Sequence, residues 1–180
     1  VSGNHGRPAS KHAGSHPLTN WDRVCYDVLR VQLLGTDGAP NADVRERVTV
    51  NISDGWHSVV RLWDWGLLLI HGDQIRGGFA GFPWYAVGRK AQKWRSSIQE
   101  PWDYLFLGHF HTPSAFSLND VEVRANGTTE SDNEFARAEL GASGDPQQRL
   151  CFFSERHGLV SESMLHLSDE RTPLAKRFAK

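Results

Sequence analysis

The sequence has little cysteine, almost no net charge and no long apolar run. Its 180 residues include only two cysteines, Cys25 and Cys151, which lie far apart. This usage excludes a disulfide framework, and we expect two reduced thiols in a cytoplasmic protein. The formal net charge of -1 favours neither nucleic-acid nor membrane binding through bulk electrostatics. The apolar runs are far shorter than the ~18 residues that indicate a membrane span, so we expect no membrane partner.

The composition that remains is ordinary for a globular protein. Hydrophobic residues make up 39% of the chain and charged residues 23%. A chain of this length can bury the core of one domain but not of two sizeable ones. We therefore expect residues 1–180 to form a single domain, and the composition leaves its oligomeric state open.

Hydrophobic periodicity predicts two helices and a larger number of strands. One helix is expected over 20–34, with Thr19 as its N-cap and Gly35 as its stop, and another over 84–98. Alternating or short apolar runs bounded by turn residues predict strands. These strands are expected at 47–52, 59–65, 67–70 (with a tight turn at Gly66), 104–107, 121–125, 149–153 and 159–167.

Two of the expected strands are unbroken apolar runs that end in histidine. Leu67–Ile70 is followed by His71-Gly72-Asp73, and Tyr104–Leu107 is followed by Gly108-His109-Phe110-His111. Short, continuously apolar strands are typical of parallel sheets that are buried on both faces. In open α/β sheets, ligands bind at the carboxyl ends of the strands. The pattern therefore predicts a metal site at that edge, although histidines at strand ends can also be satisfied by backbone carbonyls.

Three short motifs carry a resemblance to a known family. In chain order they are Gly3-Asn4-His5, His71-Gly72 and Gly108-His109-Phe110-His111. Together they resemble the later motifs of the calcineurin-like metallophosphoesterases, and Asn126-Gly127 is similar to the phage-borne members. The resemblance implies an α/β fold, a two-sheet sandwich flanked by helices, and an activity of phosphoester hydrolysis.

The resemblance also implies a dinuclear metal site. By analogy with the family motifs, Asn4, His71 and His109 bind one divalent ion and His111 binds the other. Imidazole and amide-oxygen ligands suit Mn, Fe or Zn better than Ca or Mg. Two such ions share a hydroxide that attacks phosphorus, which explains why the family needs them.

The resemblance gives two further residues a catalytic role. His5 is implied as the acid that protonates the leaving oxygen, and Arg7 as a clamp on the phosphate. The substrate is expected to be a phosphoester, and monoesters, cyclic nucleotides, phosphoproteins and nucleic acids stay open. A basic face on the helix expected over 84–98 can follow a nucleic-acid backbone or simply face solvent.

Two motifs of the family do not occur in the sequence. The family uses Asp-x-His and Gly-Asp-x-x-Asp, both upstream of Asn-His, to complete its metal ligands, and neither pattern is present. We therefore expect the 180 residues to be the carboxyl-terminal part of a catalytic domain, without its amino-terminal strands, and inactive alone. The alternative hypothesis is a non-catalytic α/β interaction module, or a subunit, that keeps degenerate metal motifs.

Overall fold

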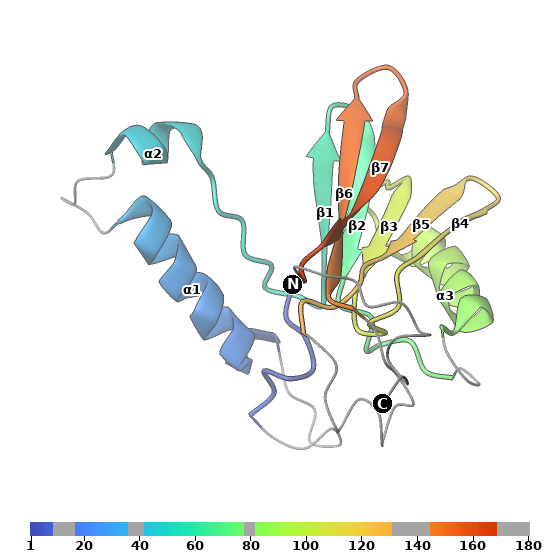
Figure 1. The fold of residues 1–180 in the computed structure, drawn as a ribbon, viewed down its shortest axis with the longest axis horizontal. Coiled ribbons are helices and arrows are strands. Elements are labelled where there is room, and N and C mark those ends of the chain that lie inside the picture. The colour runs from blue at the N-terminus through green and yellow to red at the C-terminus, as the bar shows by residue number, and fades with distance from the viewer. Residues whose placement is uncertain (9–16, 36–41, 78–81, 131–144, 169–180) are drawn as a thin grey trace, which may run out of the picture.

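The computed structural model describes residues 1–8, 17–35, 42–77, 82–130 and 145–168. Figure 1 shows a mixed α/β arrangement in which two α-helices come first along the described chain, and the strands follow with one further helix among them. In order, the elements are η1 (Pro17–Thr19), α1 (Trp21–Leu34), α2 (Ala42–Arg47), β1 (His57–Leu62), β2 (Trp65–Ile70), α3 (Trp84–Ser97), β3 (Tyr104–Leu107), β4 (Ser114–Leu118), β5 (Val121–Ala125), β6 (Gln147–Ser154) and β7 (Gly158–His166). Within the described ranges, no helix has both the length and the apolarity needed to cross a membrane.

Five strands form one mixed sheet in the order β1-β2-β3-β5-β4. The three central strands, β2, β3 and β5, run parallel, and the edge strands β1 and β4 are antiparallel to their neighbours. Parallel strands that pair in register end at the same edge of the sheet. That edge therefore carries His71, Gly108 and Asn126, which directly follow β2, β3 and β5. The prediction that two histidine loops meet at one carboxyl edge is confirmed.

Successive side chains of β3 point to opposite faces of the sheet, and each face has its own cover. Leu105 and Leu107 belong to the apolar core, which also includes Val87, Ala91 and Trp94 of α3. On the other face, the ring of Tyr104 lies 5.1 Å from that of Phe153 in the hairpin of β6 and β7. Within the described residues, the five-stranded sheet thus has α3 on one face and the β6–β7 hairpin on the other.

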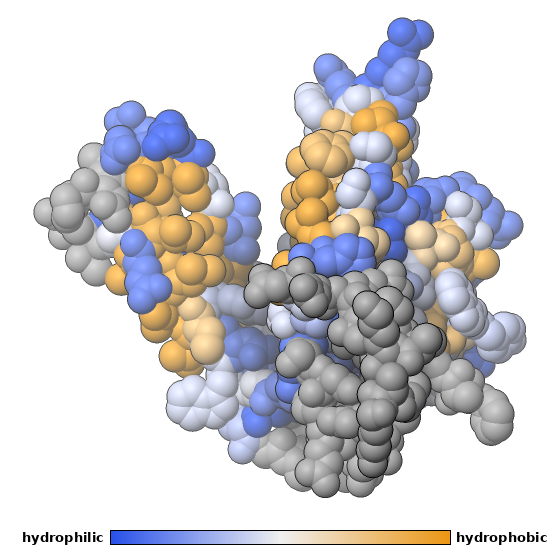
Figure 2. Space-filling view, in the orientation of Figure 1, coloured by the Kyte–Doolittle hydropathy of each residue, from blue (hydrophilic) through white to orange (hydrophobic). Residues whose placement is uncertain are grey.

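Helix α1 has a capping residue at each end, and its apolar side is exposed. The side chain of Asn20 accepts a hydrogen bond from the Asp22 amide, so Asn20 is the N-cap and the expectation of Thr19 is wrong by one residue. The helix ends at Gly35, whose φ of 71° suits glycine. Figure 1 places α1 and α2 away from the sheet, and Figure 2 shows the apolar side chains gathered along α1. Trp21, for example, is 63% exposed.

Three details of the expected secondary structure are wrong. The strand expected over 47–52 is absent, because the chain is helical up to Arg47 and has no regular structure over 48–52. The turn between β1 and β2 lies at Trp63-Asp64 and not at Gly66, which is inside β2. Strand β4 was not expected from the sequence. It pairs with β5 after a tight turn at Asn119-Asp120, where Asn119 has a φ of 53°.

Candidate metal centre

Three side chains from distant parts of the chain meet at the carboxyl edge of the sheet. The Oδ1 atom of Asn4 lies 2.6 Å from Nε2 of His71 and 3.1 Å from Nδ1 of His109. The two imidazole rings are inclined at 65° to each other, with their centroids 5.1 Å apart. An amide oxygen and two ring nitrogens therefore converge, and they belong to the three residues that the family resemblance assigns to one metal ion.

The sheet fixes the two histidines relative to each other. Ile70 and Leu107 are paired in the parallel register of β2 and β3, so His71 and Gly108 leave the sheet side by side. The amide of Gly108 donates to the carbonyl of His71 at 2.9 Å, which extends the ladder by one bond. The positions at which the two histidine loops begin are thereby determined by two of the three central strands of the sheet.

Asn4 reaches this edge because the loop that carries it is bound to the start of α1. The Gly3 amide donates to Oδ2 of Asp22 at 2.6 Å, and Nδ2 of Asn20 donates to the Gly3 carbonyl at 2.7 Å. The Trp21 amide donates to the carbonyl of Gly6 at 2.7 Å. One helix terminus therefore holds both ends of the Gly3–Gly6 loop.

The backbone around the histidines adopts unusual conformations. His109 has a φ of 67° and His111 a φ of 54°, in the left-handed region that residues with a Cβ rarely adopt. Such conformations cost on the order of 1–3 kcal/mol each and cluster at functional sites. Gly72 has a φ of 119°, and a Cβ there would lie 3.1 Å from Cβ of His109. The loop is built for a particular placement of its two histidines.

Burial lowers the pKa of His71 below the ordinary histidine range. The carboxylates of Asp73 and Asp22 oppose this shift, while His5 and His111 reinforce it through charge repulsion. The lowered pKa favours the neutral form of the His71 imidazole. A neutral imidazole has a free lone pair and is the form that binds metal ions.

The chemical types of these donors are ones that a divalent ion uses in proteins. Catalytic metal sites commonly use three protein ligands and leave a position open for water or substrate. Two imidazole nitrogens and an amide oxygen suit Mn, Fe or Zn. Among the described residues, no group of three or more His, Cys, Asp or Glu side chains is placed to hold a metal. A second ion, with His111 as its ligand, thus stays a prediction.

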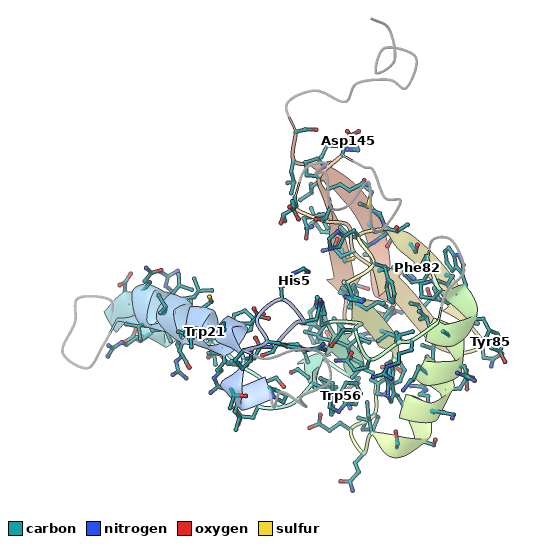
Figure 3. The ribbon with its side chains drawn as sticks, turned by 90° about the horizontal axis from the view of Figure 1, so that it is seen from below. His5, Trp21, Trp56, Phe82, Tyr85 and Asp145 are labelled. Carbon is teal, nitrogen blue, oxygen red and sulfur yellow. The ribbon has the colours of Figure 1, made fainter. Side chains whose placement is uncertain are left out.

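The two residues with implied catalytic roles lie on the Asn4 loop. His5 is exposed, and Figure 3 shows it on the segment between α1 and the sheet. Arg7 forms an ion pair with Oδ2 of Asp73, two residues beyond His71. This pair was not expected from the sequence. The only signal for it in the sequence is that Asp73 follows the predicted ligand His71 by two residues, and Arg7 follows the predicted ligand Asn4 by three.

We expect Gly3→Ala to lower the affinity for a divalent ion by about tenfold, as displacing a ligand's support typically does. A Cβ at Gly3 would lie 3.0 Å from Cε1 and Nδ1 of His71, so the ring has to move by a few tenths of an ångström. Gly55→Ala is the matched control, because its Cβ would meet nothing closer than 3.9 Å. Titration calorimetry with Zn²⁺ measures both. Equal affinities in the two variants would contradict the close packing of Gly3 on His71.

Comparisons with known proteins give distant structural likenesses only. No family model and no curated protein matches the sequence. Vps29 from Entamoeba histolytica in complex with zinc is 12% identical over 91% of this chain and 96% of that chain, with a TM-score of 0.43. A predicted phosphoesterase from Streptococcus pneumoniae is 12% identical over 81% of this chain and 91% of that chain, with a TM-score of 0.36.

Vps29 from Cryptosporidium parvum is 17% identical over 62% of this chain, with a TM-score of 0.42. This chain spans 57% of the length of that protein. TM-scores this low do not establish a shared fold. What the chain does must therefore be inferred from its own residues.

Proposed function

We propose that the chain belongs to a metal-dependent phosphoester hydrolase of the calcineurin-like type. The observation that supports this is the convergence of Asn4 Oδ1, His71 Nε2 and His109 Nδ1 at the carboxyl ends of parallel strands. Imidazole and amide donors of this kind suit a Mn, Fe or Zn ion. Such an ion, when bound, supplies a hydroxide nucleophile near neutral pH.

The residues around this site have complementary roles in the proposed reaction. His5 adjoins the ligand Asn4 and is exposed, so its imidazolium can donate a proton to the leaving oxygen of a substrate that enters from solvent. Arg7 can contact the phosphate through its guanidinium, which Asp73 holds beside the centre. His111 is assigned to a second ion, in line with its place in the same strained loop.

The test is metal-dependent hydrolysis of bis(4-nitrophenyl) phosphate by the full-length gene product. We expect activity with Mn²⁺. In the double variant His109→Ala/His111→Ala we expect the activity to fall at least about 100-fold, because removing a metal ligand lowers activity at least as much as removing a residue that only orients a ligand. The matched control is His157→Ala/His166→Ala, which removes two exposed histidines of the β6–β7 hairpin. Full activity in the His109/His111 variant would overturn the proposal.

One observation favours a second candidate, a non-catalytic interaction module. Most apolar residues of α1 are exposed, and none of its residues is buried. Exposed apolar surface of this kind is typical of protein–protein contact sites. Metal analysis after dialysis discriminates between the candidates, because a hydrolase retains Mn, Fe or Zn and a module with degenerate motifs does not.

A further inference from the structure

A basic pocket lies beside the metal centre. Its volume is about 450 Å³, which is within the range of ligand-binding pockets. Four cationic side chains and one carboxylate line it: Arg7, Arg76, Arg89, Lys90 and Asp73. The chain as a whole has a formal net charge of -1, so this concentration of positive charge is local.

The pocket and the metal centre share two segments of chain. Arg7 lies three residues beyond Asn4, and Asp73 lies two residues beyond His71. The Gly72 amide donates to Oε1 of Gln74, another lining residue, at 3.3 Å, which ties the pocket wall to the same loop. A group bound in the pocket is therefore a near neighbour of a group bound at the metal.

The charges of the pocket are only partly compensated. Asp73 is 10% exposed at its side chain and pairs with Arg7. Its other oxygen, Oδ1, is buried without a hydrogen-bond partner among the described residues. Among the residues that the structure describes, Arg76, Arg89 and Lys90 form no ion pair. Arg95, further along the helix that carries Arg89 and Lys90, does have a carboxylate partner, because it pairs with Asp120 at 2.6 Å.

Helix α3 adds to the positive potential. Ala86, Arg89 and Lys90 have the i, i+3, i+4 spacing of one helical face, and all three line the pocket. The first turn of α3 contains no acidic residue, and its N-cap, Pro83, forms no side-chain capping bond. The positive end of the helix dipole is thus not neutralised there. Arginine and lysine in this setting bind phosphate.

An exposed aromatic side chain stands next to these cations. Tyr85 is 81% exposed, and the guanidinium of Arg89 lies 5.9 Å from the centre of its ring. Figure 3 shows Tyr85 on the outer side of α3, with its ring directed away from the helix. Cations interleaved with exposed aromatic rings are typical of surfaces that bind single-stranded nucleic acid, because unpaired bases stack on the rings.

Taking the proposed function as given, we propose that this pocket binds the phosphate adjacent to the scissile one in a single-stranded oligonucleotide. Arg89 and Lys90 contact the non-scissile phosphate, and Tyr85 stacks on an unpaired base. The substrate class of the metal centre is thereby a nucleic-acid strand and not an isolated phosphomonoester.

The test measures binding of a fluorescein-labelled single-stranded DNA of about 12 nucleotides by anisotropy, in EDTA. We expect Arg89→Ala/Lys90→Ala to weaken binding about tenfold or more and to lower the salt slope by about 1.4, since each single-strand phosphate contact contributes about 0.7. Tyr85→Ala should weaken binding about tenfold through the loss of stacking. The control Lys93→Ala/Arg156→Ala removes the same charge from exposed positions outside the pocket.

Two results would overturn the proposal. One is equal weakening in the pocket variant and the control, which indicates binding through net charge alone. The other is that Arg89→Ala/Lys90→Ala binds the oligonucleotide as the wild type does but binds pyrophosphate more weakly. That result would assign the pocket to a small polyphosphate. Because the assay contains neither free metal nor turnover, its failure is separate from failure of metal-dependent hydrolysis.

Discussion

The variant His71→Ala is expected to bind Zn²⁺ at least about 100-fold more weakly than the wild-type chain. His71 supplies one of three converging donor atoms, and its Nε2 lies 2.6 Å from the amide oxygen of Asn4. Loss of the imidazole leaves one ring nitrogen and one amide oxygen, and two neutral ligands do not hold a divalent ion against water. Titration calorimetry, or competition with a chromophoric chelator, measures the change.

The control for this measurement is His157→Ala. His157 lies in the exposed turn of the hairpin, where its backbone amide, and not its ring, donates to Ser154. We expect this variant to bind Zn²⁺ as the wild type does. An affinity of His71→Ala within about threefold of the control would show that the ion binds elsewhere, and the proposed metal centre would be wrong.

The second large effect is expected for Leu105→Ala, which should lower the free energy of unfolding by about 2–5 kcal/mol. Leu105 is fully buried in the central strand β3, against the core that α3 covers. Its replacement removes three carbon atoms from a site with neighbours on every side. Since small domains are stable by only about 5–15 kcal/mol, this is a large fraction of the total.

Urea denaturation followed by tryptophan fluorescence measures this effect. Leu150→Ala is the matched control, because it makes the same chemical change at a residue of the hairpin that is 39% exposed. Surface substitutions of this kind change stability by about 0.5 kcal/mol or less. A loss below about 1 kcal/mol for Leu105→Ala would contradict the central place of β3 in the core.

Local sequence was sufficient to predict the parts of the fold in which local and long-range preferences agree. The strand expected over 104–107 is β3 with the same bounds, and the run 67–70 lies within β2. Both are short apolar runs that are buried on both faces and end at turn residues. The helix expected over 84–98 is confirmed as α3 to within one residue, because its apolar stripe lies on the core.

The incorrect predictions concern segments whose secondary structure depends on pairing with residues far away in the sequence. Val48, Val50 and Ile52 alternate as in a strand, but a strand needs a neighbour to accept its backbone hydrogen bonds, and no neighbour pairs with 48–52 in the described structure. Conversely, Ser114–Leu118 has a weak pattern and forms β4 because β5 offers an unpaired edge.

Part of the candidate site could likewise be predicted from the sequence, and part could not. That His71 and His109 lie close together follows from two parallel strands that end in histidine. The position of Asn4 does not, since more than 60 residues separate it from His71, and only the family resemblance linked them. The ion pair of Arg7 with Asp73 and the basic pocket next to it are likewise long-range arrangements with no local pattern.

The attachment of the Asn4 loop to α1 links the candidate metal centre to the exposed apolar face of that helix. Gly3 and Gly6 are held by Asp22, Asn20 and Trp21 at the start of a helix whose apolar side faces solvent. A rotation of α1 would therefore shift the amide oxygen of Asn4 relative to the histidines, which follow strands of the sheet. Thermodynamic reciprocity then requires that a partner which reorients α1 changes the affinity for metal, and that metal changes the affinity for the partner by the same factor.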